Sequence, residues 1–267
     1  MHLVVWVREI WDTRDLVGEI LDAAGHPRWG NWEGRFDPED LNGLEMALQI
    51  KDKYPETRVT ALSVGGPRKL DVLRECLYRG VDQSIRLVGA GEDGGISGEA
   101  RLVAGALRKL GAVDALFTGV QLNEGETLQR GPYLAALMGW PVVSYVEAVE
   151  SVEGGRMRLR RAIEGGVQVV EARCPAVVSV GVALLKEDPR APRSAKAKLK
   201  LQHKKTVIQK WGLGDLGITE GMSQCDVRIA NYGALDLRAF PSKRINGSSS
   251  DELRGIVEEL RQRGLLR

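Results

Sequence analysis

The residues best suited to chemistry gather in one stretch, TGVQLNEGETLQRGPYLAALMG at 118–139. An apolar run ends there in glycine, and acidic, hydroxyl and basic side chains precede an amphipathic helical pattern. If the helix begins at Thr127, its free N–H groups and positive dipole end suit a phosphate. The stretch therefore indicates a nucleotide-binding loop. The simpler alternatives are that Thr127 only caps the helix and that Arg130 is a solvated first-turn side chain.

Two further loops follow predicted strands. One starts at the end of the first strand, near Trp6–Glu9, and is completed by RFDPEDLNG at 35–43. The other is SVGGP at 63–67, where Gly65 and Gly66 let the backbone approach a ligand without an intervening Cβ. Such strand ends meet at one edge of a parallel sheet, so the three loops together predict a nucleotide crevice. For the glycine pair alone, a tight turn is the simpler interpretation.

Several other chemistries lack their motifs. The sequence has no Gly-x-x-x-x-Gly-Lys-Ser/Thr and no Gly-x-Gly-x-x-Gly after the first strand, which argues against Walker-type phosphate transfer. It has no Gly-x-Ser-x-Gly elbow, and its three histidines lack metal-ligand spacing. The cysteines lie far apart and predict unbridged thiols in a reducing cytoplasm. They are Cys76, Cys174 and Cys225.

Strands and helices alternate in the segments that must position these loops. Short β-branched runs predict strands over 2–8, 58–64, 84–88, 113–118 and 142–149. Helical patterns lie between them over 40–53, 67–79, 98–110 and 127–138, the second opening with Pro67. This alternation predicts an α/β fold whose parallel sheet is covered by helices on both faces.

The pattern changes after residue 142. Strand-like pieces broken at Gly154-Gly155 and Gly165-Gly166 predict antiparallel hairpins added to the parallel core. Residues 186–205 are expected to form an exposed excursion, and NGSSSDE to cap a last helix over 249–264. We therefore expect a nucleotide-binding domain with its hairpin extension over 1–185, and a basic loop with a carboxyl-terminal arm over 186–267.

The charge distribution limits the partners. The 267 residues carry a net charge of only +2, which gives no overall case for nucleic acid or membrane binding. Residues 190–205 nevertheless hold seven Lys/Arg and no acid, typical of a solvated surface or of a docking site for an acidic protein. No apolar run is long enough for a membrane span, and the amino terminus lacks a signal-peptide pattern. A cytoplasmic protein is expected.

Taken in order, several segments resemble the beta subunit of electron transfer flavoprotein along most of the chain. They are VVWVREI, DPEDLNGLEMALQIKD, VTALSVGGPRKLDVLRECLYRGVDQSIRL, ALFTGVQLNEGETLQRGPYLAALMGWPVVSYVEAVE and RAIEGGVQVVEARCPAVVSV. The resemblance implies a Rossmann-like sheet of the adenine-nucleotide-binding (HUP) type and a heterodimer with an alpha subunit that carries redox-active FAD. Such a complex shuttles electrons between dehydrogenases, of acyl-CoA or NADH-linked type, and a quinone-linked or other acceptor. The chain would be an electron-transfer protein rather than a stand-alone enzyme.

The resemblance also implies a cofactor site. In the common form the beta subunit holds a structural AMP, whereas in the electron-bifurcating branch it binds a second FAD and interacts with NADH. GETLQRGP, at 125–132, is similar to the bifurcating series, which favours FAD with the Thr127 hydroxyl and helix-terminal amides on its pyrophosphate. AMP is the alternative occupant. The implied cofactor residues are Trp6, Asp37, Pro38, Glu39, Asp40, Val64, Gly65, Gly119, Gln121, Asn123, Glu124, Gly125, Glu126, Thr127, Leu128, Gln129 and Arg130.

The chain departs from the family at several positions. Glu39 replaces an aromatic residue, Val120 stands where a basic residue is common, and Trp6 replaces a small residue beside the expected adenine. Trp6 would either stack on the adenine or block it. The family's dehydrogenase-docking loop usually has a leucine before its Lys-Ala-Lys, and this chain has none just before Lys196. The expected docking residues are Arg190, Arg193, Lys196, Lys198 and Lys200.

One competing function remains on the sequence alone. A stress-type ATP- or AMP-binding regulatory module, self-associating and colourless, would use a similar nucleotide fold. The turn at Glu164-Gly165-Gly166 matches the family's acidic-Gly-Gly turn, which lies near the alpha subunit's flavin. That turn is expected at the subunit interface and carries no catalytic residue.

Overall fold

The computed structural model describes residues 1–14, 16–18, 20–22, 26–28, 30, 32–67, 70–89, 95–121, 128–181, 193–219 and 249–266. The chain divides into two compact units, Met1–Asn231 and Tyr232–Arg267. The described part of the second unit is one amphipathic helix, α6 (Ser250–Gln262). The division predicted at 185/186 stays a prediction.

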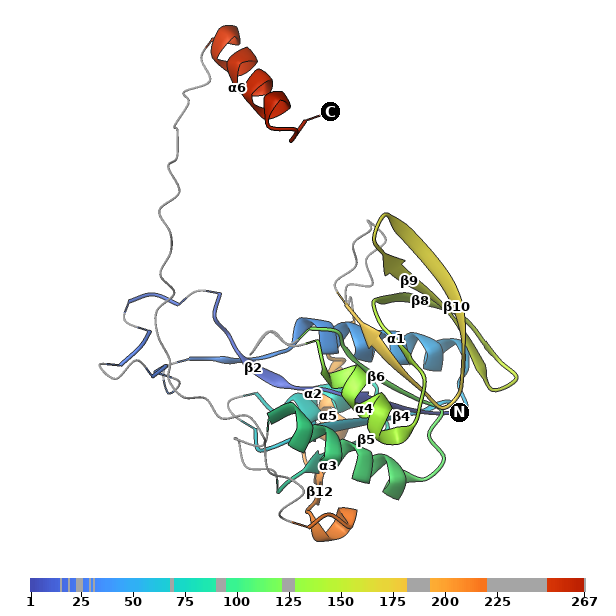
Figure 1. Ribbon diagram of the computed structural model, residues 1–267. Helices are drawn as coiled ribbons and strands as arrows, with labels where there is room; N and C mark the ends of the chain where they lie inside the picture. Colours follow the sequence, from blue (N-terminus) through green and yellow to red (C-terminus); the bar gives the residue numbers. More distant parts are fainter. Residues whose placement is uncertain are drawn as a thin grey trace. The chain divides into compact units, whose positions relative to one another are not determined.

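A parallel sheet forms the centre of the first unit (Figure 1). Its strands lie in the order β12-β5-β4-β1-β6-β11-β7, and each pairs with its neighbours in parallel. They are β1 (His2–Trp6), β4 (Arg58–Val64), β5 (Gln83–Leu87), β6 (Ala115–Gly119), β7 (Val142–Val143), β11 (Ala176–Val180) and β12 (Gln209–Trp211). All of β6 and β11 is buried, as expected of strands that are covered on both faces.

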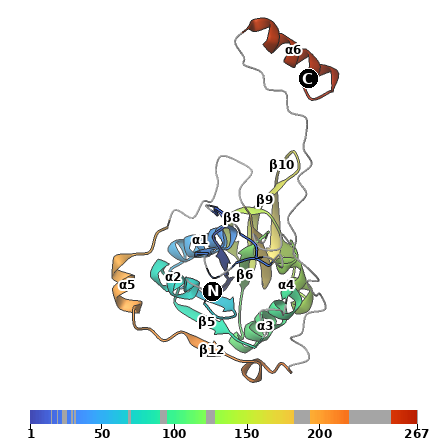
Figure 2. The same ribbon diagram turned by 90° about the vertical axis from the view of Figure 1, so that its left-hand side faces the viewer.

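Helices cover both faces of this sheet (Figure 2). On one face α1 (Pro38–Lys53) and α2 (Val72–Arg79) contribute Leu44 and Val72 to an apolar cluster with strand residues such as Val5. On the other face α3 (Gly95–Leu110) and α4 (Arg130–Met138) pack over Val4 and Leu116. The predicted α/β class is confirmed.

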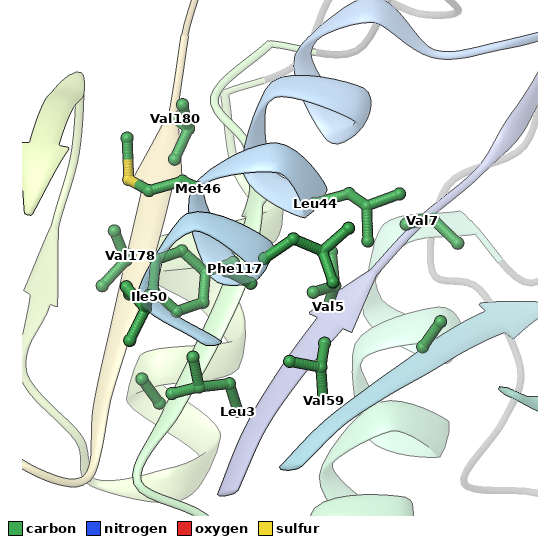
Figure 3. Packing of buried hydrophobic residues seen from close by; sticks show 14 of the residues in the cluster. Leu3, Val5, Val7, Leu44, Met46, Ile50, Val59, Phe117, Val178 and Val180 are labelled. Carbon is green, nitrogen blue, oxygen red and sulfur yellow. The ribbon is translucent and has the colours of Figure 1, made fainter. Parts of the chain in front are cut away.

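The larger cluster lies between α1 and the sheet (Figure 3). Leu44 and Ile50 of α1 point toward the sheet, where Phe117 lies between the neighbouring strands. Burial of such side chains contributes about 1.5–3 kcal/mol each, which fixes α1 against β1 and β6.

A separate antiparallel sheet packs on the α1 side. It contains β8 (Val146–Glu153), β9 (Arg156–Ile163) and β10 (Gly166–Arg173), with β9 in the middle. Gly154 and Gly155 have φ of 56° and 71°, and Gly165 has φ of 78°, so both predicted glycine breaks are hairpin turns. A further short ribbon pairs β2 (Glu9–Trp11) with β3 (Gly34–Phe36). The predicted hairpins are thus confirmed.

The parallel sheet takes up more of the chain after residue 142 than predicted. The strand expected over 142–149 divides into β7 and β8, because Tyr145 adopts a φ of 59° and turns the chain from one sheet into the other. β11 inserts between β6 and β7, and β12 pairs with β5 at the edge. The region predicted to form hairpins therefore also supplies two strands, β7 and β11, to the parallel sheet.

The segment predicted to be an exposed excursion is partly docked. Residues 193–205 include α5 (Ala197–His203), which lies beside α2 (Figure 2). The Lys196 amide donates to the Tyr78 carbonyl at 2.9 Å, and Arg74 Nη1 donates to the His203 and Lys204 carbonyls at 3.0 and 3.1 Å. Arg74 thereby binds the carbonyl end of α5, as cations commonly do.

Candidate functional site

The strand order reverses at β1, which identifies the switch point of the fold. The chain moves outward from β1 through β4 to β5, then returns to place β6 on the other side of β1. Ligands of open α/β sheets bind at such a point, beyond the carboxyl ends of the strands. β1 ends there at Trp6 and β6 at Gly119, both within the predicted cofactor set.

Asp37 organises the loop that follows β3. Its Oδ1 accepts hydrogen bonds from the Glu39 and Asp40 amides at 3.0 and 3.4 Å, and Pro38 occupies the first helical position. Asp37 is therefore the N-cap of α1, which begins two residues before the predicted start at 40. Its buried carboxylate caps the helix, and the Glu39 and Asp40 amides that donate to it are not free to bind a phosphate.

Arg130 lies in the interior rather than in solvent. Its Nη1 donates to Asp40 Oδ1 and Oδ2 at 2.8 and 3.0 Å, and its Nη2 donates to the Trp6 carbonyl at 3.4 Å. Its guanidinium carbon is 4.1 Å from the centre of the Trp6 ring, a cation–π contact. Arg130, Asp40 and Trp6 have no exposed surface, so the alternative of a solvated first-turn arginine was wrong.

The same helix turn contacts the start of the 120–129 loop. Asp40 Oδ1 accepts the Gly119 amide at 2.8 Å, and Glu39 Oε2 accepts the Gln121 amide at 2.6 Å. A Cβ on Gly119 would lie 2.8 Å from Glu39 Cβ, so the close approach requires glycine. Burial raises the pKa of Asp40 to about 6, although Arg130 lowers it.

The middle of this loop is outside the described residues. Asn123, Glu124, Gly125, Glu126 and Thr127 therefore stay predictions. The helix that follows begins at Arg130, three residues later than predicted. Gln129 holds the N-cap position without a side-chain capping bond, and Leu128 is half exposed beside it.

The glycine pair after β4 faces open space. Gly65 has a φ of 83°, and a Cβ added to Gly65 or Gly66 would meet nothing within 4 Å. Val64, which ends β4, is partly buried. The Gly65 carbonyl accepts from Arg86 Nη1 at 2.9 Å. Sequence reasoning missed Arg86, because nothing in its own strand indicates that it supports this loop.

Pro67 does not open a helix. α2 begins at Val72, because tertiary contacts hold the two residues just before it: the Leu70 amide donates to Glu9 Oε1 at 2.5 Å and Arg86 Nη2 donates to Asp71 Oδ1 at 2.8 Å. The predicted helix start at 67 is therefore wrong. Two features fit a nucleotide phosphate. The glycine pair leaves room for it, and the start of α4, where Gln129 makes no side-chain capping bond, offers backbone N–H donors.

Four buried polar atoms lie on the α4 side of the strand ends without a hydrogen-bond partner among the described residues. They are Trp6 Nε1, Thr118 Oγ1, Ser179 Oγ and Arg130 Nε. Thr118 and Ser179 are paired across β6 and β11. Buried polar atoms of this kind are normally hydrogen-bonded to water or to a ligand group. These four atoms can therefore still form hydrogen bonds at the switch point.

The expected docking residues form two groups. Arg193 is engaged within the unit: its Nε is 3.2 Å from Glu45 Oε2 and its Nη2 is 2.6 Å from Asp52 Oδ2. Lys196, Lys198 and Lys200 are exposed on and beside α5, while Arg190 is outside the described residues. The exposed lysines remain available to an acidic partner.

Other site types find no support in the described part of the chain. No cluster of His, Cys, Asp and Glu with the makings of a metal site occurs there. Cys76 and Cys174 are free thiols, and Cys225 is outside the described residues. Every described helix is too short or too polar to cross a bilayer.

Known proteins match this chain over most of its length. The family model for the electron transfer flavoprotein domain matches residues 31–209. Electron transfer flavoprotein subunit beta of Clostridium acetobutylicum is 31% identical over 263 residues, covering 97% of this chain and 91% of that protein. Protein FixA of Azorhizobium caulinodans is 32% identical over 282 residues, covering 98% and 95%. Caffeyl-CoA reductase-Etf complex subunit CarD of Acetobacterium woodii is 32% identical over 194 residues, 71% of each chain.

The chain therefore belongs to the electron transfer flavoprotein family, and within it to the beta subunits.

Proposed function

We propose that this chain is the beta subunit of a heterodimer that passes electrons from a dehydrogenase, or from NADH, to a quinone-linked or acyl-CoA-linked acceptor. The observation that carries the proposal is its likeness to a beta subunit and to FixA over nearly the whole chain. Among the described residues, the buried hydroxyls at the switch point, Thr118 Oγ1 and Ser179 Oγ, have no hydrogen-bond partner and hence no base to activate them. We assign activity to the complex with an alpha subunit.

The proposed cofactor of the crevice is FAD, with AMP as the alternative. Two features favour a nucleotide here: open space above Gly65 and Gly66, and a start of α4 without a side-chain cap. The name of the relative CarD places that protein in a caffeyl-CoA reductase–Etf complex, and the similarity of residues 125–132 to the bifurcating series favours FAD over AMP. When bound, FAD supplies the redox chemistry, while the protein supplies position and electrostatics.

The pyrophosphate contacts are assigned to the 122–127 segment and the first amides of α4. Gly125 carries no side chain, which suits a pyrophosphate, and we assign the Thr127 hydroxyl as a donor to the phosphate, both residues being outside the described part of the chain. Trp6 and Arg130 are already stacked on one another, so we assign them to the base of the crevice beneath the nucleotide. The exposed Lys196, Lys198 and Lys200 form the docking surface for an acidic redox partner.

Counting nucleotides in the purified complex tests the proposal. The chain is co-expressed with a flavoprotein alpha subunit, the complex is denatured, and the released FAD and AMP are quantified per heterodimer. Two FAD per heterodimer support the bifurcating form, and one FAD with one AMP supports the common form. A colourless, stable homodimer that binds ATP would contradict both and favour a stress-type regulatory module.

A further inference from the structure

Tyr145 adopts a backbone conformation that tyrosine rarely accepts. Its φ is 59°, and among the described residues it is the one non-glycine residue with a positive φ. A bulky side chain is disfavoured there, because its Cβ crowds the backbone, and glycine or asparagine is the usual occupant. Either of these could make the turn from β7 to β8 without strain. Strained residues cluster at ligand sites, so the conformation points to a role for the ring beyond folding.

The ring of Tyr145 lies at the rim where the parallel strands end. A Cβ added to Gly181, the residue after β11, would lie 3.6 Å from Tyr145 Cδ1 and 3.8 Å from Glu39 Oε1. The ring therefore stands beside the end of β11 and close to the start of α1. Gly181 is buried, whereas Tyr145 is 39% exposed. A partly exposed aromatic ring is thus presented at the edge of the sheet where open α/β folds bind ligands.

Tyr145 also begins an exposed apolar row across one end of the hairpin sheet. Its carbonyl accepts the Ala162 amide at 2.9 Å, and Ala162 is paired with Val167 of β10. Val167 and the neighbouring Ile163 are 45% and 41% exposed. Tyr145 therefore lies where the ligand edge of the parallel sheet meets the apolar surface of the hairpin sheet. A cofactor bound at this edge, or one carried by a subunit that covers this surface, would reach the ring.

We propose that Tyr145 is a stacking platform for the isoalloxazine ring of a flavin. The choice of flavin rests on the proposed function. Isoalloxazine is planar and electron-poor, so its face packs well on the electron-rich face of a phenol. The ring of Trp6 is not available for this role, because it is fully buried and covered by Arg130. The flavin is either FAD held by this chain or the FAD of the alpha subunit, and the contact has the same chemistry in both cases.

Substitutions at Tyr145 separate the ring from the backbone strain. Tyr145→Phe keeps both, whereas Tyr145→Asn removes the ring and tolerates the positive φ. Val142→Asn on β7 is the matched control, because Val142 is 38% exposed. Since asparagine relieves the strain, the urea midpoint of Tyr145→Asn should lie at or above that of the wild type. A midpoint that falls in Tyr145→Asn but not in Tyr145→Phe would show that the ring is held for folding, which overturns the proposal.

Two measurements test the contact with flavin. The full chain is titrated with FAD and with AMP, and the rate of flavin release is measured for the co-expressed heterodimer. Tyr145→Asn should weaken FAD binding or speed flavin release about tenfold, and it should leave AMP binding unchanged because AMP has no isoalloxazine. Tyr145→Phe and Val142→Asn should behave like the wild type. An effect confined to the titration assigns the platform to FAD held by this chain, and one confined to the heterodimer assigns it to the FAD of the alpha subunit.

The remaining outcomes overturn the proposal. Unchanged FAD affinity and unchanged flavin release in folded Tyr145→Asn exclude the platform. Equal weakening of FAD and AMP would show that the ring contacts the part they share. Loss of the alpha subunit with normal flavin release would make Tyr145 a protein contact only. A wild-type complex without flavin removes the proposed function as well, whereas flavin retained equally by the wild type and Tyr145→Asn leaves that function intact.

Discussion

Asp40 shows how burial changes the role of a residue that the sequence identifies by type. Its carboxylate interacts with Arg130 from α4, with Asp37 at the start of its own helix, and with the amide of Gly119. Removal from water disfavours its charged form, and Asp37 adds to that effect, while Arg130 opposes it. The result is a pKa of about 6 in place of 3.8.

This pKa makes stability depend on pH. Because the folded-state pKa lies above the unfolded value, the carboxyl contributes stability that is fully present below pH about 4 and is lost as the pH rises through about 6. The contribution is at most about 3 kcal/mol. We expect the difference in unfolding free energy between wild type and Asp40→Asn/Arg130→Met to decrease from pH 4 to 6.5 and to be level above. Urea denaturation measures it, and a flat difference across this range would contradict the raised pKa.

At the residue scale the sequence identified the neighbourhood but not the contacts that these residues make with one another. Trp6, Asp40 and Arg130 were all assigned to the cofactor, and the structure does bring them together. They also bind one another. Asp40 and Arg130 are 90 positions apart, so no local pattern in the sequence shows that they meet. Glycines were more predictable, since the positive φ of Gly65 and the hairpin turns follow from glycine itself.

At the scale of elements, the long buried strands were predictable and the helix starts were not. β4 has the predicted bounds, because its apolar and β-branched residues end at the Gly65-Gly66 pair. α2 and α4 begin five and three residues later than the predicted 67 and 127. In α2, the contacts of Leu70 and Asp71 with distant residues override the proline signal. β12 has only three residues and is formed by pairing with β5, which periodicity cannot reveal.

The contact between α1 and β6 supports a prediction at this scale. A Cβ at Gly119 would approach Glu39 Cβ and the Asp40 amide at 2.8 and 3.2 Å, which pushes the first turn of α1 away from β6. Gly119→Ala should therefore lower the unfolding free energy by about 1–3 kcal/mol. Thermal and urea unfolding measure the change.

Gly43→Ala is the control for the same helix–strand contact. Its Cβ would lie 3.6 Å from the Thr118 backbone, an ordinary contact, and alanine favours the helix. Its stability should stay within about 1 kcal/mol of the wild type. Equal destabilisation by the two alanines would show that general crowding, rather than the loop contacts at Gly119, limits this interface.

At the scale of the whole molecule, the sequence predicted the fold class but not the strand order. The hairpin sheet was predicted from its glycine turns. The sequence pattern did not show which of its side chains are exposed. Val167 and Val169 alternate along β10 and are 45% and 42% exposed. Within the described residues β10 pairs only with β9, so an eight-residue edge strand with two exposed valines is left at the rim (Figure 1). Natural proteins rarely leave such an edge uncovered.

We therefore expect β10 to lie in the interface with the alpha subunit of the proposed heterodimer. Lysine in place of both valines, Val167→Lys/Val169→Lys, would bring two charges into that apolar contact and weaken co-purification of the alpha subunit by at least about tenfold. Val207→Lys is the matched control, because Val207 is 86% exposed and lies outside the hairpin sheet. Circular dichroism verifies that the variants fold, since both valines project into solvent. A double variant that keeps the alpha subunit as tightly as the wild type would place the interface elsewhere on the chain, and the loss of binding in the Val207 variant would point to α5 and the residues that follow it.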